Sequence, residues 1–467
     1  MGPTLTRRAA SWRLWLSSAL IPWILGCASP VATAPPQEGF AGMQAYRIEE
    51  PVFGGHMVVY EAGRGQPRSV LLVHGIGQGG ARDWRETVAW LRQSFHVVAV
   101  DLPGFGASAK ANVLYSPTNY ARVLNHVAGR YLRRPFVLVG HSMGAVVSLR
   151  YAATYAQNVE RLVVIDAPGI LHRYSVTSHF LAQLGMAFVP PWLDPVEGLL
   201  DFARKLLVPL ERLRVEPRTI LASPQMRDSV LGGDPARIAG LAAVSEDLSA
   251  DLPAVRAETL VLWGGKDLLV PVRTGKVLAS MLPRARLQLI ERAGHTPMLE
   301  SPEAFRAALA PFLERGLAGV PRALPAPLLR QGSQQCLRER HRVYEGDYDV
   351  LTIEGCRQTT IRNARVRELR ILDSIVTIED SHIGGGETGM HASNSTVVAT
   401  GVRFEGEVAI TARASRLDLA AVVLVGRRAA VTAPERSHVV FSFSRVQSPN
   451  LKGEVHAFFT LGPENPL

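Results

Sequence analysis

Val137-Leu138-Val139-Gly140-His141-Ser142-Met143-Gly144 is the stretch that decides the fold. Its three leading apolar residues predict a buried strand, and Ala145–Ala156 after it predicts a helix. Gly-x-Ser-x-Gly between them predicts a sharp turn, because the two glycines lack a Cβ and let strand and helix approach closely. Such a turn holds the Ser142 hydroxyl out at the end of a sheet, with the Met143 backbone N–H beside it. Ser142 is therefore a candidate nucleophile, and the alternative is an ordinary buried turn serine.

Strand-like and helix-like segments alternate on both sides of this stretch. Continuous apolar runs predict strands that are buried on both faces, whereas apolar residues at helical spacing predict helices over Asp83–Gln93 and Ser116–Leu132. The predicted strands are Val70–Val73, Val97–Val100, Val159–Ile165, Thr259–Trp263 and Arg286–Ile290. Strands that alternate with helices predict an α/β fold with a parallel sheet, and such sheets bind ligands at the carboxyl ends of their strands.

The motifs at these strand ends resemble those of the α/β-hydrolase family, over roughly residues 46–317. They are His74-Gly75, Asp101–Gly106, Gly140–Gly144, Gly264–Asp267 and Gly294-His295. The resemblance implies an α/β-hydrolase fold with a helical cap, in which Ser142, Asp267 and His295 form a catalytic triad in the family's chain order. The residue chemistry agrees with this, because a carboxylate at Asp267 can orient an imidazole, and His295 can move the serine proton to the leaving group.

The acid and the oxyanion hole are less defined by the sequence. Asp166 also ends a strand, and some members of the family take the acid from that position, so it is the alternative to Asp267. Two backbone N–H groups, those of Ile76 and Met143, are expected to form the oxyanion hole. Backbone donors need no particular side chain, so this expectation depends on position alone.

The identity of the nucleophile excludes some chemistries of similar proteins. Relatives that dehalogenate or open epoxides use an aspartate there, whereas Ser142 implies an acyl-serine intermediate. Ester hydrolysis is the default reaction, with amide, thioester or lactone cleavage and acyl transfer as alternatives. We expect no cofactor and no metal, and we expect His74, Asp101 and His141 to shape loops.

A long insertion separates two of the predicted strands, over Ile170–Ala254. It is apolar, helix-like and punctuated by proline, and it matches the position of the family's cap, at about residues 170–255. We expect a lid whose inner face lines an apolar pocket for an acyl or other lipophilic substrate. The alternative is that its apolar residues only pack the cap onto the core.

The N-terminus reads as an export signal over residues 1–26. Arg7-Arg8 precede an apolar run, Trp12–Leu25, that is too short to span a bilayer. The following Gly26-Cys27 resembles the lipobox of bacterial lipoproteins, which implies that Cys27 becomes an acylated N-terminus, with palmitate as one such acyl group. Residues 27–45 would then tether the protein to a membrane. Because Ala28 follows the cysteine instead of an aspartate, we expect the outer membrane, facing the periplasm or the surface. The alternatives are a plain signal peptide and an N-terminal anchor helix.

Length and charge limit the partners. The chain has 467 residues, too many for one core, so two domains are expected. Its formal net charge is +10, but the arginines are scattered and no basic helix with interleaved aromatic residues occurs. A nucleic-acid partner is therefore excluded, and the expected partners are a small or lipid-like ester and a membrane reached through the lipid anchor.

The chain changes character after a Pro-rich linker over residues 318–335. From residue 336 to 467, short β-type runs recur with a period near twenty. Leu351, Ile371, Met390, Ile410 and Val431 begin similar runs, at spacings of 20, 19, 20 and 21 residues. This period resembles the pectin-lyase-like right-handed parallel β-helices, and the alternative is an irregular β-sandwich. Charged residues do not cluster in the repeats, so we expect a spacer or a glycan- or protein-binding role.

Two of the cysteines lie at the start of this predicted solenoid. Cys336 and Cys356 flank the first predicted coil and match no zinc spacing. In an oxidising periplasm they can form a disulfide that closes the open end of the solenoid.

Together these observations predict a lipid-anchored serine hydrolase of the bacterial envelope. Two alternatives belong to other classes: an adhesion or scaffolding protein with a vestigial hydrolase domain, and an aminopeptidase or amidase of the same fold.

Overall fold

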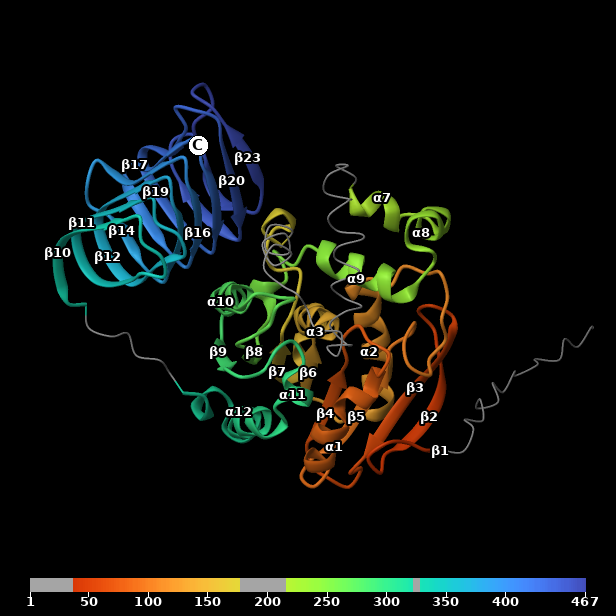
Figure 1. Cartoon of the computed structure of the whole chain (residues 1–467). Coiled ribbons are helices and arrows are strands. Elements are labelled where there is room, and N and C mark those ends of the chain that lie inside the picture. Colours follow the sequence, from red (N-terminus) through yellow and green to blue (C-terminus); the bar gives the residue numbers. More distant parts are fainter. Residues whose placement is uncertain (1–36, 177–215, 322–327) are drawn as a thin grey trace, which may run out of the picture.

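The computed structural model of the chain describes residues 37–176, 216–321 and 328–467 (Figure 1). The predicted leader, Cys27 and the apolar lid residues from Phe180 to Leu207 lie outside these ranges. Within them, no helix combines the length and the apolar character that crossing a membrane requires.

A nine-stranded sheet forms the centre of the first domain, in the order β1-β2-β3-β5-β4-β6-β7-β8-β9. The strands from β5 to β9 along this order are parallel, and β1, β2 and β3 form an antiparallel edge. Their bounds are β1 Gln37–Glu38, β2 Gln44–Glu50, β3 Gly55–Ala62, β4 Ser69–Val73, β5 His96–Asp101, β6 Phe136–His141, β7 Val159–Ile165, β8 Glu258–Gly264 and β9 Ala285–Ile290. The sheet thus begins inside the stretch that the sequence predicts as a tether.

Helices cover both faces of this sheet, as the buried strands predict. In β4, Leu71 and Val73 face one hydrophobic core, whereas Val70 and Leu72 face the other. Buried side chains of α2, α3 and α10 join the first core, and those of α1 and α12 join the second. The bounds are η1 Gly80–Trp84, α1 Arg85–Leu91, α2 Pro117–Tyr131, α3 Met143–Thr154, η2 Ala156–Asn158, α10 Val272–Met281, α11 Pro297–Glu300, α12 Pro302–Arg315 and η5 Gly316–Gly319.

The described part of the insertion is helical. It contains α7 (Pro217–Leu221), α8 (Pro224–Leu231), α9 (Pro235–Ser245) and the short η4 (Leu252–Ala254). Proline occupies the first turn of each of these helices, where its missing N–H costs no hydrogen bond. α9 packs on the core of the sheet through buried residues such as Ile238 and Leu241. In Figure 1, α7, α8 and α9 lie at the carboxyl end of the strands, where a cap is expected.

The second domain is a parallel β-solenoid. Successive coils pair in parallel from β10 to β21, and two antiparallel pairs, β21·β22 and β20·β23, close its C-terminal part. A parallel ladder of this kind excludes the antiparallel β-sandwich. The bounds are β10 Arg330–Leu337, β11 Val343–Glu354, β12 Thr359–Leu372, β13 Ile375–Glu379, β14 His382–Gly384, β15 Thr388–Ser393, β16 Thr396–Thr400, β17 Arg403–Arg413, β18 Arg416–Ala420, β19 Val423–Thr432, β20 Ser437–Ser442, β21 Ser444–Gln447, β22 Lys452–Val455 and β23 Phe458–Leu461.

Two details of the predicted solenoid are corrected. β10 begins at Arg330, inside the stretch predicted as a linker. Leu369, rather than Ile371, pairs with both Leu351 and Met390. Both Leu369 and Ile371 are fully buried, two residues apart on the same strand face, so the apolar pattern alone does not separate them. The later register of Met390, Ile410 and Val431 is as predicted.

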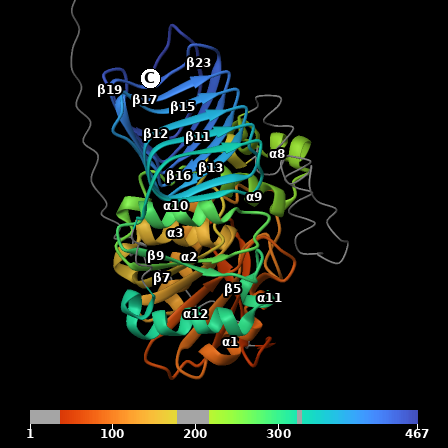
Figure 2. The same ribbon diagram turned by 60° about the vertical axis from the view of Figure 1, so that its left-hand side comes forward.

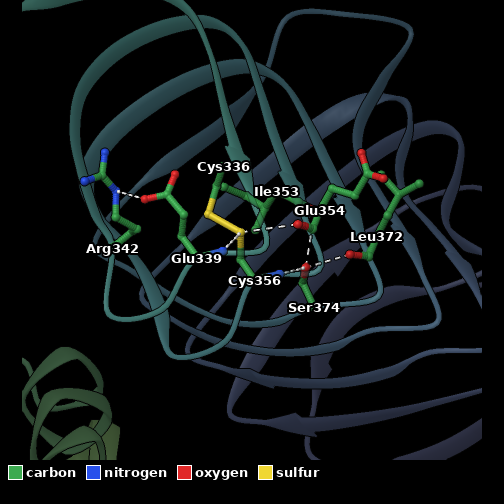
Figure 3. Close-up of a disulfide and its surroundings, with 8 residues drawn as sticks. All are labelled: Cys336, Glu339, Arg342, Ile353, Glu354, Cys356, Leu372 and Ser374. Carbon is green, nitrogen blue, oxygen red and sulfur yellow. Dashed lines mark hydrogen bonds and ion pairs between the residues drawn. A yellow bond between two sulfur atoms is a disulfide. The ribbon is translucent and has the colours of Figure 1, made fainter.

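A serine ladder and a disulfide stabilise one corner of the solenoid. Figure 3 shows the disulfide and the first serine of the ladder, Ser374. The backbone N–H of Ser374, Ser395 and Ser415 each donates to the hydroxyl of the equivalent serine one coil later. Cys356 occupies the preceding rung, because its N–H donates to Ser374 Oγ at 2.9 Å. The Cys356 side chain forms a disulfide with Cys336 on β10, so the first coil is covalently closed.

The disulfide should stabilise the solenoid. In the chain-entropy account, closing a loop of 20 residues contributes about 3 kcal/mol to the free energy of unfolding. We expect Cys336→Ser, or reduction of the native protein, to lower the midpoint of thermal unfolding measured by circular dichroism. Thiol titration of the non-reduced, unfolded protein provides the control, since two reactive thiols from this pair would contradict the bond.

Candidate active site

Ser142 lies in a strained turn between β6 and α3. Its φ is +52°, a left-handed value that non-glycine residues rarely adopt. Both flanking glycines are required by close approach: a Cβ on Gly140 would lie 2.4 Å from the Gly144 carbonyl oxygen, and one on Gly144 would lie 2.4 Å from the Val73 carbonyl oxygen. The backbone N–H of Ser142 donates to Ile165 O at 2.8 Å, which ties the turn to the neighbouring strand.

Three strand ends bring Ser142, His295 and Asp267 into one hydrogen-bonded chain. Ser142 follows β6, Asp267 follows β8 and His295 follows β9. His295 Nε2 lies 3.0 Å from Ser142 Oγ, and His295 Nδ1 lies 2.8 Å from Asp267 Oδ2. All three side chains are buried. This is the spatial arrangement that a nucleophile, its base and an orienting carboxylate require.

The environment keeps Asp267 ionised. Burial by itself would raise the pKa of its carboxyl, but His295 and two backbone N–H groups lower the pKa below its ordinary value. Those N–H groups belong to Leu269 and Val270, which donate to Asp267 Oδ1 at 2.8 and 2.9 Å. Oδ2 therefore remains available to accept from His295 Nδ1–H, which leaves Nε2 free to accept the proton of Ser142.

Asp166, the alternative acid, has a different environment. It is fully buried at the end of β7, and its Oδ1 accepts from the Gly264 N–H at 2.9 Å. Burial and the nearby charge of Asp267 raise the pKa of Asp166 well above its ordinary value. Asp267, and not Asp166, is the carboxylate that hydrogen-bonds His295 Nδ1, so the geometry favours Asp267 as the acid.

The backbone near Ser142 is placed as an oxyanion hole requires. Met143 begins α3, so its N–H has no acceptor within the helix. The chain at Gly75 passes directly beside the nucleophile, because a Cβ there would lie 2.8 Å from Ser142 Cβ. Ile76 follows Gly75, and the pairing of the Ile76 and Met143 N–H groups around a substrate oxygen stays a prediction.

Two neighbouring histidines hold loops, as expected. The Leu102 N–H donates to His74 Nε2 at 3.0 Å, so His74 Nδ1–H donates to the Gly75 carbonyl oxygen at 2.6 Å. His141 Nε2 lies 2.7 Å from the His295 carbonyl oxygen and can only donate to it. Burial and the adjacent His295 lower the pKa of His141 to about 3, so His141 is neutral at physiological pH.

Asp101 holds the loop after β5 in the same manner. The N–H of Ala81 donates to Asp101 Oδ1 at 2.8 Å, and the N–H of Ala107 donates to Oδ2 at 2.9 Å. Tyr60 OH donates to Oδ2 as well, at 3.0 Å. Asp101 is thus saturated by donors from three segments, which fits a structural role.

One supporting residue was missed by the sequence reasoning. Glu300 Oε2 accepts from the Gly294 N–H at 2.5 Å, and Oε1 accepts from the Thr296 N–H at 2.8 Å. These bonds clamp the loop on both sides of His295. A signal was present, since a carboxylate in a short turn can reach back to preceding N–H groups. Among the residues that the structure describes, no three His, Cys, Asp or Glu side chains gather as a metal site needs.

Comparison with known proteins supports the fold. Residues 70–308 match the Alpha/beta hydrolase family, which is just over half of the chain. The chain belongs to the α/β-hydrolase family.

Three individual proteins are among those similar to this chain. A pimeloyl-[acyl-carrier protein] methyl ester esterase of Edwardsiella ictaluri is 30% identical over 261 residues, which cover 53% of this chain and 93% of the relative. The monoacylglycerol lipase abhd6-B of Xenopus laevis is 28% identical over 293 residues, covering 58% and 82%. The solved structure of a thermophilic esterase from Thermogutta terrifontis is 24% identical and has a TM-score of 0.42, covering 58% of this chain and 99% of its own.

Substitution of the two aspartates should separate their roles in this hydrolase. Asp267→Asn should lower kcat by up to about 10⁴-fold, because the amide favours the wrong tautomer of His295. Asp166→Asn replaces a carboxyl that does not hydrogen-bond His295 by a group of the same size, and we expect kcat within about tenfold of the original. Steady-state hydrolysis of a short p-nitrophenyl ester measures both. A larger loss in Asp166→Asn than in Asp267→Asn would identify Asp166 as the acid.

Proposed function

We propose that this α/β-hydrolase is a serine hydrolase that cleaves carboxylic esters. The observation that carries the proposal is the hydrogen-bonded chain from Asp267 through His295 to Ser142 Oγ at the strained turn. A serine hydroxyl is a weak nucleophile until a base takes its proton, and His295 Nε2 is placed to do so.

The proposed reaction has two halves. Ser142 Oγ attacks the ester carbonyl carbon while its proton moves to His295 Nε2, and Asp267 stabilises the imidazolium. The Ile76 and Met143 N–H groups bind the negatively charged oxygen of the tetrahedral intermediate. His295 then gives its proton to the departing alcohol, which leaves acyl-Ser142. Water, deprotonated by His295, attacks this acyl-enzyme, and the acid is released as Ser142 regains its proton.

An acyl ester is the substrate class we propose. The names of the two relatives describe enzymes that act on a monoacylglycerol and on a pimeloyl-[acyl-carrier protein] methyl ester. Both activities break an ester bond next to an acyl group, which is the chemistry that an acyl-serine intermediate performs. The cap over the strand ends agrees with an apolar acyl group, since the insertion is rich in apolar residues.

We also propose that the hydrolase acts at the bacterial envelope, anchored through Cys27. The proposal is supported by the apolar segment before Gly26-Cys27 and by the disulfide of Cys336 and Cys356, since disulfides persist in oxidising compartments. Several acyl chains on Cys27 would give a stable anchor, because one chain alone binds a bilayer only marginally.

Ser142→Ala tests the proposed reaction. The variant lacks the nucleophile, so we expect it to lose hydrolysis of short p-nitrophenyl esters and labelling by a fluorophosphonate probe, while its circular dichroism spectrum stays that of the original protein. Ser94→Ala, at an exposed serine of the same domain, is the control, and it should still be labelled. Unchanged ester turnover in Ser142→Ala would contradict the mechanism, and faster cleavage of aminoacyl amides than of esters would point to an amidase.

Cys27→Ser tests the anchor. Without the thiol no lipid can be attached, so we expect the variant to lose incorporated palmitate and to move from the membrane fraction to the soluble fraction of the producing bacterium. Ser29→Ala is the control and should keep both properties. Palmitate incorporation that survives in Cys27→Ser would refute lipidation at this residue.

A further inference from the structure

The solenoid lies against the hydrolase domain at the end that carries the active site. In both views it stands on the same side as the cap helices and next to α10 (Figures 1 and 2). The contacts come from β13, β16, β18 and β20 and from the turns that follow these strands. Ala420, Ala421 and Phe443 of the solenoid even pack into the hydrophobic core of the hydrolase domain.

Asp418 on β18 is the polar centre of this interface. Its Oδ2 lies 2.9 Å from Arg273 Nη1, and its Oδ1 lies 3.1 Å from Arg273 Nη2, so the ion pair is bidentate. Ser175 Oγ donates to the same Oδ1 at 2.9 Å. The side chains of Arg273 and Asp418 are only 14% and 10% exposed, so water screens the pair weakly.

Arg273 connects Asp418 to the loop of the catalytic acid. It lies in the first turn of α10, directly after Asp267–Val270. In that loop the N–H groups of Leu269 and Val270 bind Asp267 Oδ1. Arg273 also donates from Nε to Thr400 Oγ1 at 3.2 Å, so the solenoid holds its guanidinium from two sides.

Ser175 connects the same carboxylate to the beginning of the lid. The segment from Gly169 to Ser175 leads from β7 into the insertion. It is bound to the solenoid a second time, because the His172 N–H donates to Ser442 Oγ at 2.8 Å. One carboxylate of the solenoid therefore contacts both the segment that starts the lid and the helix that follows the acid loop.

A cavity marks the same junction. Its volume is about 470 Å³. Its walls include Leu171 and Val176 from the start of the lid, Leu241 and Val244 from α9, and Phe443 and His456 from the solenoid. The solenoid thus supplies part of the wall beneath the cap, rather than standing apart as a spacer.

We propose that Asp418 is a positioning residue of the hydrolase, through which the solenoid holds the acid loop and the first segment of the lid in their active arrangement. This proposal rests on the proposed function, because Asp418 would position groups of that same active site. Asp418 touches neither the substrate nor the reacting atoms, and it acts through Arg273 and Ser175. Removing the charge of Asp418 leaves the largely buried guanidinium of Arg273 without a carboxylate to balance its charge, which is a strongly unfavourable state.

Asp418→Asn in the full-length protein tests this. We expect kcat per active site, with active sites counted by fluorophosphonate labelling, to fall by roughly ten- to a hundredfold, since small displacements of a catalytic group have effects of that size. A merely structural role would lower the fraction of folded protein but not kcat per labelled site. Glu407→Gln is the matched control, because Glu407 pairs with Arg427 on the exposed surface of the solenoid. It should leave kcat unchanged.

A double substitution adds specificity to the test. Arg273→Gln together with Asp418→Asn removes the unpaired charge that each single substitution leaves, so the double variant should lose less than the sum of the two single losses. Strictly additive losses would show that the two residues act independently and would overturn the proposal.

Hydrogen exchange separates this inference from the proposed reaction. In folded Asp418→Asn, amides of residues 166–176 and 264–273 should exchange faster, while those of β4 and β6 should not change. This readout needs no substrate, so it remains decisive if the original protein hydrolyses no ester and the proposed function fails. Unchanged exchange in both segments, or unchanged kcat per labelled site in an active enzyme, would overturn the role of Asp418.

Discussion

Close packing of β6 against α3 is the constraint on which the candidate site depends. At Gly140 the strand meets the Gly144 carbonyl oxygen of α3, and at Gly144 the helix meets the Val73 carbonyl oxygen at the end of β4, so neither position has room for a Cβ. Ser142 between them adopts a left-handed conformation. The register of the parallel sheet then aligns the neighbouring strand ends, with Gly140 beside Val73 and Gly264 beside Ile290. The loops that leave these ends converge on Ser142, which is why residues far apart in sequence can form one hydrogen-bonded chain.

Local pattern was sufficient for the parts of the fold that are buried on both faces. Val70–Val73 and Val97–Val100 are continuous apolar runs, and each lies within an observed strand. These runs are too short for a buried helix and rich in β-branched valine, which favours a strand that is buried on both faces. The start of α2 was equally predictable, because Ser116 accepts from the Asn119 N–H and Pro117 occupies the first position.

Edge strands and long-range polar contacts could not be predicted from local sequence patterns. β1 and β10 have mostly exposed, polar side chains, so they resemble a tether and a linker in composition. They become strands only because a neighbouring strand offers hydrogen-bond partners. Glu300 and Asp418 are similar cases, since a lone carboxylate in a sequence carries no mark of its partner. Arg273 and Asp418 are 145 positions apart, and only the folded solenoid brings them together.

The interface between the two domains combines a non-directional attraction with a directional one. Ala420, Ala421 and Phe443 bury apolar surface against the hydrolase core, which favours association but tolerates sliding. The bidentate pair of Asp418 and Arg273 has one favourable geometry, because a planar guanidinium must meet a planar carboxylate edge to edge. Desolvation offsets much of the attraction in a buried pair, so its contribution lies more in orientation than in net stability. A rigid, disulfide-closed solenoid fixed in one orientation can hold the acid loop and the start of the lid, whereas a domain held by apolar contacts alone would leave both free to shift.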